Sequence, residues 1–411
     1  MPSQTAQPPA RPPRLLFITN EPPHTAAAGS IYFHRLFSGY PADCLRVITN
    51  DTLPEPEQCL SCEYSTHRVW ADRLQQTRFW KWRTAARVMG GTNFLPLREL
   101  ERQAGSFQPD TVVTLMQDSW MYELAARYAR KNKLPLILFI HDLPHAFEQV
   151  ASRLVKRQLK RDRAIYQQAA LRFCVSPGME AWFRREFGLP GEVLLPPCSP
   201  NPPSQDPEQC RMLKTPGSLT LGYAGGLHYG YGEQIAAMVP VLRSTGTRLE
   251  IFGPSPSGNL AGLKEATDVL SFHGYAPTPE EAWSGLLARC DAVLLPYLNP
   301  PGGHHLQYQT HFPSKLGDML SLGLPLLVTG PLDASGLAWC RNHGELAVCV
   351  GDASPEALAA ALINLRDDDS LRVRLAGAAQ GVDPDAFSPD SLKTRMTDSI
   401  ERSMAGLHSC Q

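Results

Sequence analysis

Residues 293–330 constrain the fold of this chain more than any other stretch. Two apolar runs, Val293–Pro296 and Pro325–Thr329, have the length and composition of buried strands. The polar Gly/His loop between them leads into a helix predicted over Ser314–Leu322, with Ser314 as N-cap and Gly323 as the stop. This order predicts a parallel α/β unit whose loop and helix start lie beyond the carboxyl end of a strand, where open α/β sheets bind ligands.

The start of that helix is predicted to bind phosphate. Backbone N–H groups at a helix N-terminus attract anions. Lys315 follows the predicted N-cap, where a cation is unfavourable unless an anion is present. Two other interpretations remain open, namely an ordinary buried parallel-sheet unit and a solvated lysine at a helix end.

Length and charge limit the possible classes of protein. A chain of 411 residues fits two domains of roughly 200 residues each. Lys and Arg (39) nearly balance Asp and Glu (40), which does not favour nucleic acid as a partner. No apolar run is long enough to span a bilayer, and the start of the chain lacks a hydrophobic signal core. We therefore expect a cytoplasmic protein with a disordered, Pro-rich tail over residues 1–13.

The cysteines are expected to be reduced and mostly buried. Of the ten, Cys174 and Cys349 fall inside predicted strands. Cys59 and Cys62 form the single close pair, and no second pair or His partner completes a zinc site. No metal or other cofactor is expected.

The alternation of strands and helices predicts two doubly wound, Rossmann-like parallel-sheet α/β domains that face a cleft. The domains are predicted at 14–195 and 217–385, separated by a Pro-rich hinge at 196–216. Residues 386–411 contain a last amphipathic helix. The predicted strands are Leu15–Thr19, Leu45–Thr49, Thr111–Leu115, Leu136–Ile140, Leu171–Val175, Leu219–Ala224, Arg248–Phe252, Val269–His273, Val293–Pro296, Pro325–Thr329 and Leu346–Val350.

Two glycine-containing loops follow strands that open the two domains. Gly225, Gly226 and His228 come directly after Leu219–Ala224, where backbone N–H groups can cradle phosphate. Gly29 and Ser30 lie in the loop after the first strand and let a ligand approach the backbone closely. For the loop that contains Gly29 and Ser30, a plain connection is an equally good interpretation.

The segment His311–Leu316, followed by Asp318 and Gly323-Leu324-Pro325, resembles the "FPSKLxEYLAAGKPV" signature of family 4-like (group 1) glycosyltransferases of the GT-B fold. The resemblance implies transfer of a sugar from a nucleotide diphosphate donor to a hydroxyl acceptor, with retention and without metal. The acceptor implied is a polysaccharide, a glycolipid or a small glycoside. The acceptor domain would be the N-terminal one and the donor domain the C-terminal one, with the last helix, in 386–411, packing back on the first domain.

The resemblance also implies roles for individual residues. Asp318 would bind the ribose hydroxyls, Tyr275 and Ala276 the base, and Gly29 and Ser30 the donor phosphates or sugar. The remaining implied donor-binding residues are Gly225, Gly226, His228, Phe312, Pro313, Ser314 and Lys315. His141 and Asp142, at the end of a strand, are the catalytic candidates, with a structural histidine as the alternative. An inverted product would require a base, for which His141 or Asp142 is the first candidate.

Two departures from the family pattern leave other functions open. Thr310 stands where many members carry a Glu, and no Arg or Lys soon follows Gly225 and Gly226. A nucleotide-sugar-binding protein without turnover is one alternative. A nucleotide-sugar 2-epimerase is another, although residues 299–310 carry none of the carboxylates expected of one.

Two basic segments suggest a membrane surface as a secondary partner. In 73–87, Arg and Lys alternate with Phe79, Trp80 and Trp82, and 151–163 carries six basic residues. Solvated helix faces are the competing interpretation. Contact would be peripheral, on the inner face of the membrane.

Overall fold

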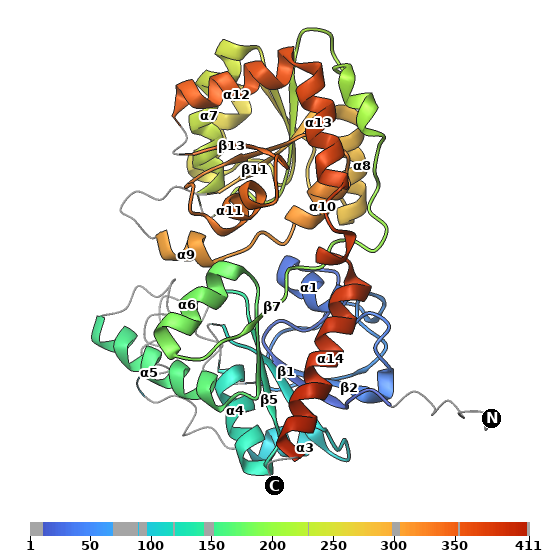
Figure 1. Cartoon of the computed structure of the whole chain (residues 1–411), viewed down its shortest axis with the longest axis vertical. Coiled ribbons are helices and arrows are strands. Elements are labelled where there is room, and N and C mark those ends of the chain that lie inside the picture. Colours follow the sequence, from blue (N-terminus) through green and yellow to red (C-terminus); the bar gives the residue numbers. More distant parts are fainter. Residues whose placement is uncertain are drawn as a thin grey trace, which may run out of the picture. The chain divides into compact units, whose positions relative to one another are not determined.

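The computed structural model describes residues 11–68, 89, 97–117, 120–143, 152–228, 230–297, 305–351 and 354–408. The chain forms two compact units, one of Met1–Leu194 with Asp390–Gln411 and one of Leu195–Pro389 (Figure 1). Residues 1–10 of the predicted tail and the whole basic segment 73–87 lie outside the described residues. Within the described ranges, no helix combines the length and apolarity that a membrane span needs.

The first unit is built on a seven-stranded parallel sheet in the order β3-β2-β1-β4-β5-β6-β7. Its longer strands are mostly apolar, and every residue of β1, β2, β4 and β5 is buried, as expected when helices cover both faces of a sheet. The strands are Leu15–Thr19 (β1), Leu45–Thr49 (β2), Glu63–Thr66 (β3), Thr111–Leu115 (β4), Leu136–Ile140 (β5), Leu171–Cys174 (β6) and Glu192–Val193 (β7).

The helices of this unit include the last helix of the chain. They are Ala28–Phe37 (α1), Arg98–Ala104 (α3), Met121–Asn132 (α4), Ser152–Gln168 (α5), Pro177–Phe187 (α6) and Pro389–His408 (α14). On α14, Lys393 donates to the Ser38 carbonyl (2.9 Å) and Ser399 Oγ donates to Glu192 (2.6 Å). The end of the chain is thus fastened to the unit that contains its beginning.

The second unit has a six-stranded parallel sheet in the order β10-β9-β8-β11-β12-β13. Its strands are Thr220–Ala224 (β8), Arg248–Phe252 (β9), Leu270–Phe272 (β10), Ala292–Pro296 (β11), Leu326–Thr329 (β12) and Val348–Val350 (β13). Its helices are Tyr231–Thr245 (α7), Pro279–Arg289 (α8), His305–Thr310 (α9), Leu316–Ser321 (α10), Ser335–Asn342 (α11), Pro355–Asp367 (α12) and Asp369–Gln380 (α13). The two doubly wound parallel sheets predicted from the sequence are confirmed.

Each sheet reverses its strand order at one point. The reversal lies between β1 and β4 in the first unit and between β8 and β11 in the second. Crossover helices leave a doubly wound sheet in opposite directions there, so ligands bind outside the carboxyl ends of these strands. Functional residues are therefore expected just after β1, β4, β8 and β11.

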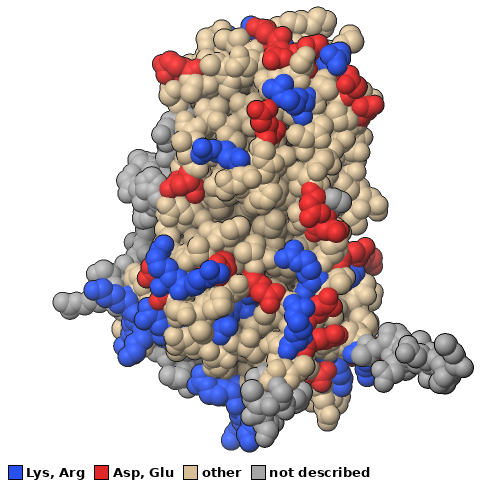
Figure 2. Space-filling model, in the orientation of Figure 1, with Lys and Arg blue, Asp and Glu red and all other residues tan. Residues whose placement is uncertain are grey.

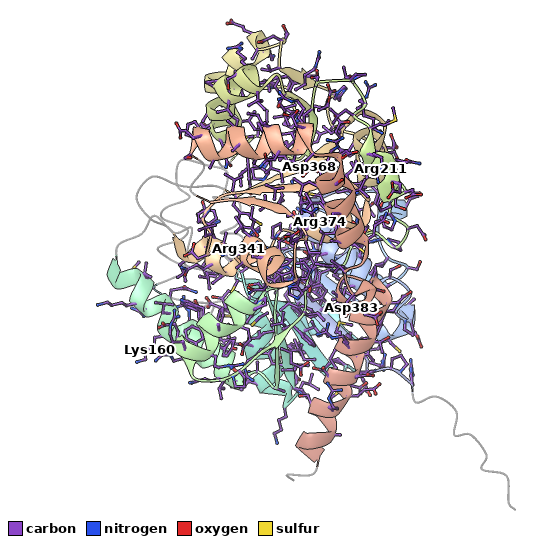
Figure 3. The ribbon with its side chains drawn as sticks, turned by 45° about the horizontal axis from the view of Figure 1, so that its top comes forward. Lys160, Arg211, Arg341, Asp368, Arg374 and Asp383 are labelled. Atoms are coloured by element: carbon purple, nitrogen blue, oxygen red, sulfur yellow. The ribbon has the colours of Figure 1, made fainter. Side chains whose placement is uncertain are left out.

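The segment predicted as a hinge, 196–216, falls within the second unit. Its backbone bonds to the unit's core through Gln205 N–H and the Leu322 carbonyl (3.0 Å), and it forms a 3₁₀ helix at Pro207–Arg211 (η4). The guanidinium of buried Arg372 on α13 donates to the carbonyls of Cys210 and Arg211, both in η4. Figure 3 labels Arg211 of η4, and it labels Asp368 and Arg374 at the start of α13 and within it. Pro-rich composition predicted the lack of regular structure but not the buried arginine that anchors it.

Candidate active site

Lys315 lies at the carboxyl end of β8, next to the strand-order reversal of the second sheet. Its Nζ donates to the Ala224 carbonyl (2.7 Å) and lies 5.0 Å from the centre of the Tyr223 ring. A Cβ at Gly225 would be 2.6 Å from the same Nζ. The structure therefore brings together two predicted site residues, Lys315 and Gly225, that are far apart in sequence.

The surroundings of the Lys315 ammonium group favour a bound anion. Burial lowers its pKa to about 8 from an ordinary 10.5. Among the ion pairs of the described residues, none involves Lys315. A buried charge without a counter-ion is costly, and a bound anion would offset that cost.

The glycine loop after β8 is closely packed by its own histidine. A Cβ at Gly226 would overlap the His228 ring, so a larger residue there would have to displace that ring. The loop ends at Gly230, where α7 begins. His228 thus lies against the loop, at the place where the family usually supplies Arg or Lys.

The helix of the signature begins two residues later than predicted. It runs from Leu316 to Ser321, its N-cap is Lys315, and no side chain caps it. Ser314 is exposed and does not have the predicted capping role, because the chain turns once more before the helical hydrogen bonds begin. Gly323 does end the helical segment, with a φ of +69° that favours glycine.

Phe312 and Pro313 were predicted to line the donor site, but their side chains are in the core. Phe312 is 2% exposed and packs at 6.1 Å from the Trp339 ring and 6.3 Å from the Phe387 ring. Pro313 is also buried. These two residues position the signature rather than offer side chains to a ligand, since aromatic packing holds Phe312 inward.

Asp318 is buried in the first turn of α10. Its Oδ1 accepts a hydrogen bond from Ser199 N–H (2.5 Å), and the Ser199 hydroxyl in turn donates to Glu280 (2.7 Å). Asp318 and Ser199 are 3% and 2% exposed. The carboxylate predicted to bind ribose is thus rigidly held. Ser199 and Glu280 are two neighbours of Asp318 that the sequence did not reveal.

Tyr275 and Ala276 follow β10 in an exposed loop. The Tyr275 residue is 65% exposed, which is unusual for so large an aromatic side chain. It is also close enough to Tyr223 to help burial raise the pKa of that phenol. Tyr223 lies under Lys315, so the predicted base-binding loop borders the predicted phosphate site.

In the first unit, His141 and Asp142 follow β5 as predicted. The His141 ring packs 4.1 Å from the Tyr32 ring and 5.1 Å from the Phe33 ring, both on α1. Asp142 is partly exposed. Gly29 and Ser30 lie in the first turn of α1 rather than in a loop, with Ser30 buried. The structure therefore brings α1 and the residues after β5 together at one edge of the sheet.

Glu21 is a candidate site residue that the sequence analysis missed. A Cβ at Gly29 would overlap the Glu21 carboxyl group, so the two residues are in contact. Burial chiefly, with the Asp142 and Asp51 carboxylates, raises the pKa of Glu21 to about 7, against the opposing effect of a hydrogen bond from Gln117. Asn20 also donates to Gln117 (3.3 Å), across the point where strand order reverses. A carboxyl group two residues after β1 was the available signal.

Thr310 does not replace the carboxylate found at its position in the family. The residue is 1% exposed, and its hydroxyl donates to the Leu306 carbonyl (2.8 Å) and the Gln307 carbonyl (3.3 Å) of its own helix. These bonds satisfy the hydroxyl within α9.

Two family models match the chain and between them cover most of it. The model of the glycosyl transferase 4-like domain matches residues 28–198, and that of glycosyl transferases group 1 matches residues 218–368. The chain is a group 1 glycosyltransferase. No functionally curated protein shows significant similarity to this transferase in sequence.

Solved structures share the fold of the transferase along its length. HepE of Anabaena, in complex with UDP and glucose, has a TM-score of 0.67 at 14% identity and covers 95% of this chain and 99% of its own. Sucrose-phosphate synthase of Thermosynechococcus elongatus has a TM-score of 0.67 at 17% identity, covering 96% and 100%. The lipopolysaccharide outer core galactosyltransferase WaaB has a TM-score of 0.59 at 13% identity, covering 94% and 99%. The transferase therefore has the GT-B fold, and as a family member it takes its sugar from a nucleotide-sugar donor.

Proposed function

We propose that the transferase moves a hexose from a UDP-sugar to a hydroxyl group of a glycan, glycolipid or small glycoside. The observation that carries the proposal is the contact of Lys315 with the glycine loop after β8, because it places a cation that forms no ion pair among the described residues beside that loop. That arrangement suits a diphosphate. The UDP in the HepE structure supports uracil as the base.

We propose that the second unit binds the donor and the first unit the acceptor. In the second unit, Asp318 would accept from the ribose, Tyr275 would contact the base, and Lys315 would neutralise the leaving diphosphate. Charge that develops on the leaving group is stabilised by a preorganised cation and helix N–H groups, which is the chemistry a metal ion provides in other enzymes. The reaction is therefore proposed to be independent of metal.

Retention of the anomeric configuration is part of the same proposal. Thr310 binds its own helix, so no carboxylate nucleophile comes from that position. The departing phosphate can instead accept the proton of the acceptor hydroxyl while the new bond forms on the same face of the sugar. His141 and Asp142 would then orient the sugar or the acceptor.

We also propose that a basic face of the first unit contacts anionic lipid at the inner membrane surface. The exposed cations of α5 and α6 are Lys156, Arg157, Lys160, Arg163, Arg184 and Arg185. Figure 2 shows Lys and Arg side chains gathered over this region. Such a cluster would bring the transferase to a lipid-linked acceptor.

Donor turnover tests the proposed reaction. The transferase is incubated with UDP-hexoses and a mixture of glycan and glycolipid acceptors, and release of UDP is measured with and without excess EDTA. We expect one UDP-hexose to be consumed at the same rate with and without EDTA. NMR analysis of the product should show the same anomeric configuration, axial or equatorial, as in the donor. Loss of turnover in EDTA with recovery on adding Mg²⁺ or Mn²⁺ would contradict metal independence, and an inverted linkage would contradict retention.

A further inference from the structure

Three polar residues from different parts of the second unit form a continuous hydrogen-bonded chain. Ser199 N–H donates to Asp318 Oδ1 (2.5 Å), and Ser199 Oγ donates to Glu280 Oε1 (2.7 Å). Asp318 belongs to α10, Glu280 to the first turn of α8, and Ser199 to the segment that precedes η4. One serine therefore holds two carboxylates.

The chain is fixed at each of its three positions. Asp318 and Ser199 are almost fully buried, so neither can reorient without disturbing the core. The start of α8 is set by Thr278, whose side chain accepts from Glu281 N–H (3.2 Å), with Pro279 in the first turn. Glu280 is partly exposed, so it lies where the chain meets solvent.

The two carboxyl groups share one partner, because each accepts a hydrogen bond from Ser199. Stability alone would be better served by apolar packing at such a position. A ligand that presents two hydroxyl donors to the pair supplies a functional reason.

The chemistry of a ribose fits the pair better than it fits Asp318 alone. A ribose carries two adjacent hydroxyls, and each can donate one hydrogen bond. Asp318 is one methylene shorter than the usual Glu, and its Oδ1 already accepts from Ser199. The Glu280 side chain is one methylene longer than that of Asp318, and it accepts a hydrogen bond from the same Ser199. Glu280 also follows Tyr275, of the proposed base-binding loop, by five positions.

We propose that Glu280 is a second ribose-binding carboxylate, held beside Asp318 by Ser199, and that the pair makes the donor site select ribonucleoside over 2′-deoxyribonucleoside diphosphates. This inference rests on the proposed function of the second unit as the donor site. Asp318 and Glu280 would each bind one hydroxyl of the ribose, so a 2′-deoxyribose leaves one carboxylate without its partner.

The test compares ribonucleotide and deoxyribonucleotide affinities by calorimetry. The full chain is titrated with UDP and dUDP, and with the ADP and GDP pairs, for wild type, Glu280→Gln and Ser199→Ala. Ser199→Ala keeps the N–H that binds Asp318 but removes the hydroxyl that holds Glu280. Glu281→Gln is the matched control, because Glu281 is exposed on the same turn. Thermal unfolding of each variant confirms that it is folded.

We expect wild type to bind the ribonucleotide at least about tenfold more tightly than its deoxy form, the value of one hydrogen bond to a charged group. Glu280→Gln and Ser199→Ala should reduce that ratio at least about threefold through weaker ribonucleotide binding, and Glu281→Gln should leave it unchanged. An unchanged ratio in folded variants that still bind the ribonucleotide would overturn this inference and leave the proposed donor site standing. If wild type bound none of the nucleotides, both proposals would be overturned.

Discussion

Replacing Lys315 with methionine is expected to abolish donor binding and at the same time to stabilise the unliganded protein. The ammonium group would be the cation that meets the diphosphate, so the affinity for UDP should fall about 100-fold or more. The stabilising effect has a separate cause. Burial disfavours the charged form of Lys315, and the pKa is about 8 in the folded protein against 10.5 for an ordinary lysine.

The sign of the effect on stability follows from these two values. The folded state binds fewer protons than the unfolded state between pH 8 and 10.5. The charged side chain therefore destabilises the fold fully below pH 8, and this cost disappears as the pH rises to 10.5. The hydrogen bond to the Ala224 carbonyl offsets part of the gain on mutation, so the net stabilisation by Lys315→Met at pH 7 is expected to be about 1 kcal/mol.

Thermal unfolding and UDP titration together measure the two effects. Lys264→Met is the control, since Lys264 is an exposed lysine of the same unit and should change neither quantity. A Lys315→Met variant that bound UDP as well as wild type would show that the diphosphate lies elsewhere. A variant with lower stability at pH 7 would show that Lys315 is a structural residue.

Glu21→Gln is expected to have the second large effect, on the pH dependence of both stability and transfer. Burial raises the pKa of Glu21 from 4.5 to about 7 in the folded protein. The ionised carboxylate thus costs nothing below pH 4.5, an increasing amount as the pH rises to 7, and a constant amount above that. Glu21→Gln should therefore stabilise the protein at pH 8 by about 1–3 kcal/mol and leave it unchanged at pH 4.5.

Transfer should respond at the same pKa if Glu21 meets the acceptor. An ionised Glu21 would accept a hydrogen bond from the acceptor hydroxyl and orient it, while the departing phosphate takes the proton. Wild-type transfer should show a titration near pH 7 that is absent in Glu21→Gln, and the rate of Glu21→Gln should be about 100-fold lower. UDP affinity should be unchanged.

Asp51→Asn separates a role in catalysis from a role in folding. The Asp51 carboxylate helps to raise the pKa of Glu21, so its removal should move both the stability transition and the rate titration to lower pH. A rate profile that Asp51→Asn and Glu21→Gln both leave unchanged would show that Glu21 acts only in the structure.

Much of the fold could be predicted because strands that are buried on both faces have nearly continuous apolar sequences. The structure has strands at or within a residue or two of every predicted range, including Leu15–Thr19 and Thr111–Leu115. The short strands β3 and β7 were missed, since Glu63–Thr66 is polar and partly exposed and Glu192–Val193 has only two residues. Helix α9 was missed because its six residues fall in a stretch whose composition indicates a loop.

The candidate site was only partly predictable. A motif in one segment, such as the signature at Lys315 and Asp318, can be found from spacing and family resemblance. Contacts across the sequence cannot, and Ser199 lies 119 residues from its partner Asp318. Glu21 escaped notice because a single carboxyl group after a strand is common. Its importance comes from burial and from Gln117, Asp51 and Asp142, which only the fold brings together.

The most direct test of the donor site is calorimetric titration of the full chain with UDP-, GDP-, ADP- and dTDP-sugars, with Asp318→Ala beside wild type. The proposed function predicts that wild type binds one class of UDP-sugar with micromolar affinity and that Asp318→Ala loses this binding, because the buried carboxylate holds the ribose. Equal binding by wild type and a folded Asp318→Ala, or no binding of any donor by wild type, would contradict a nucleotide-sugar site in the second unit.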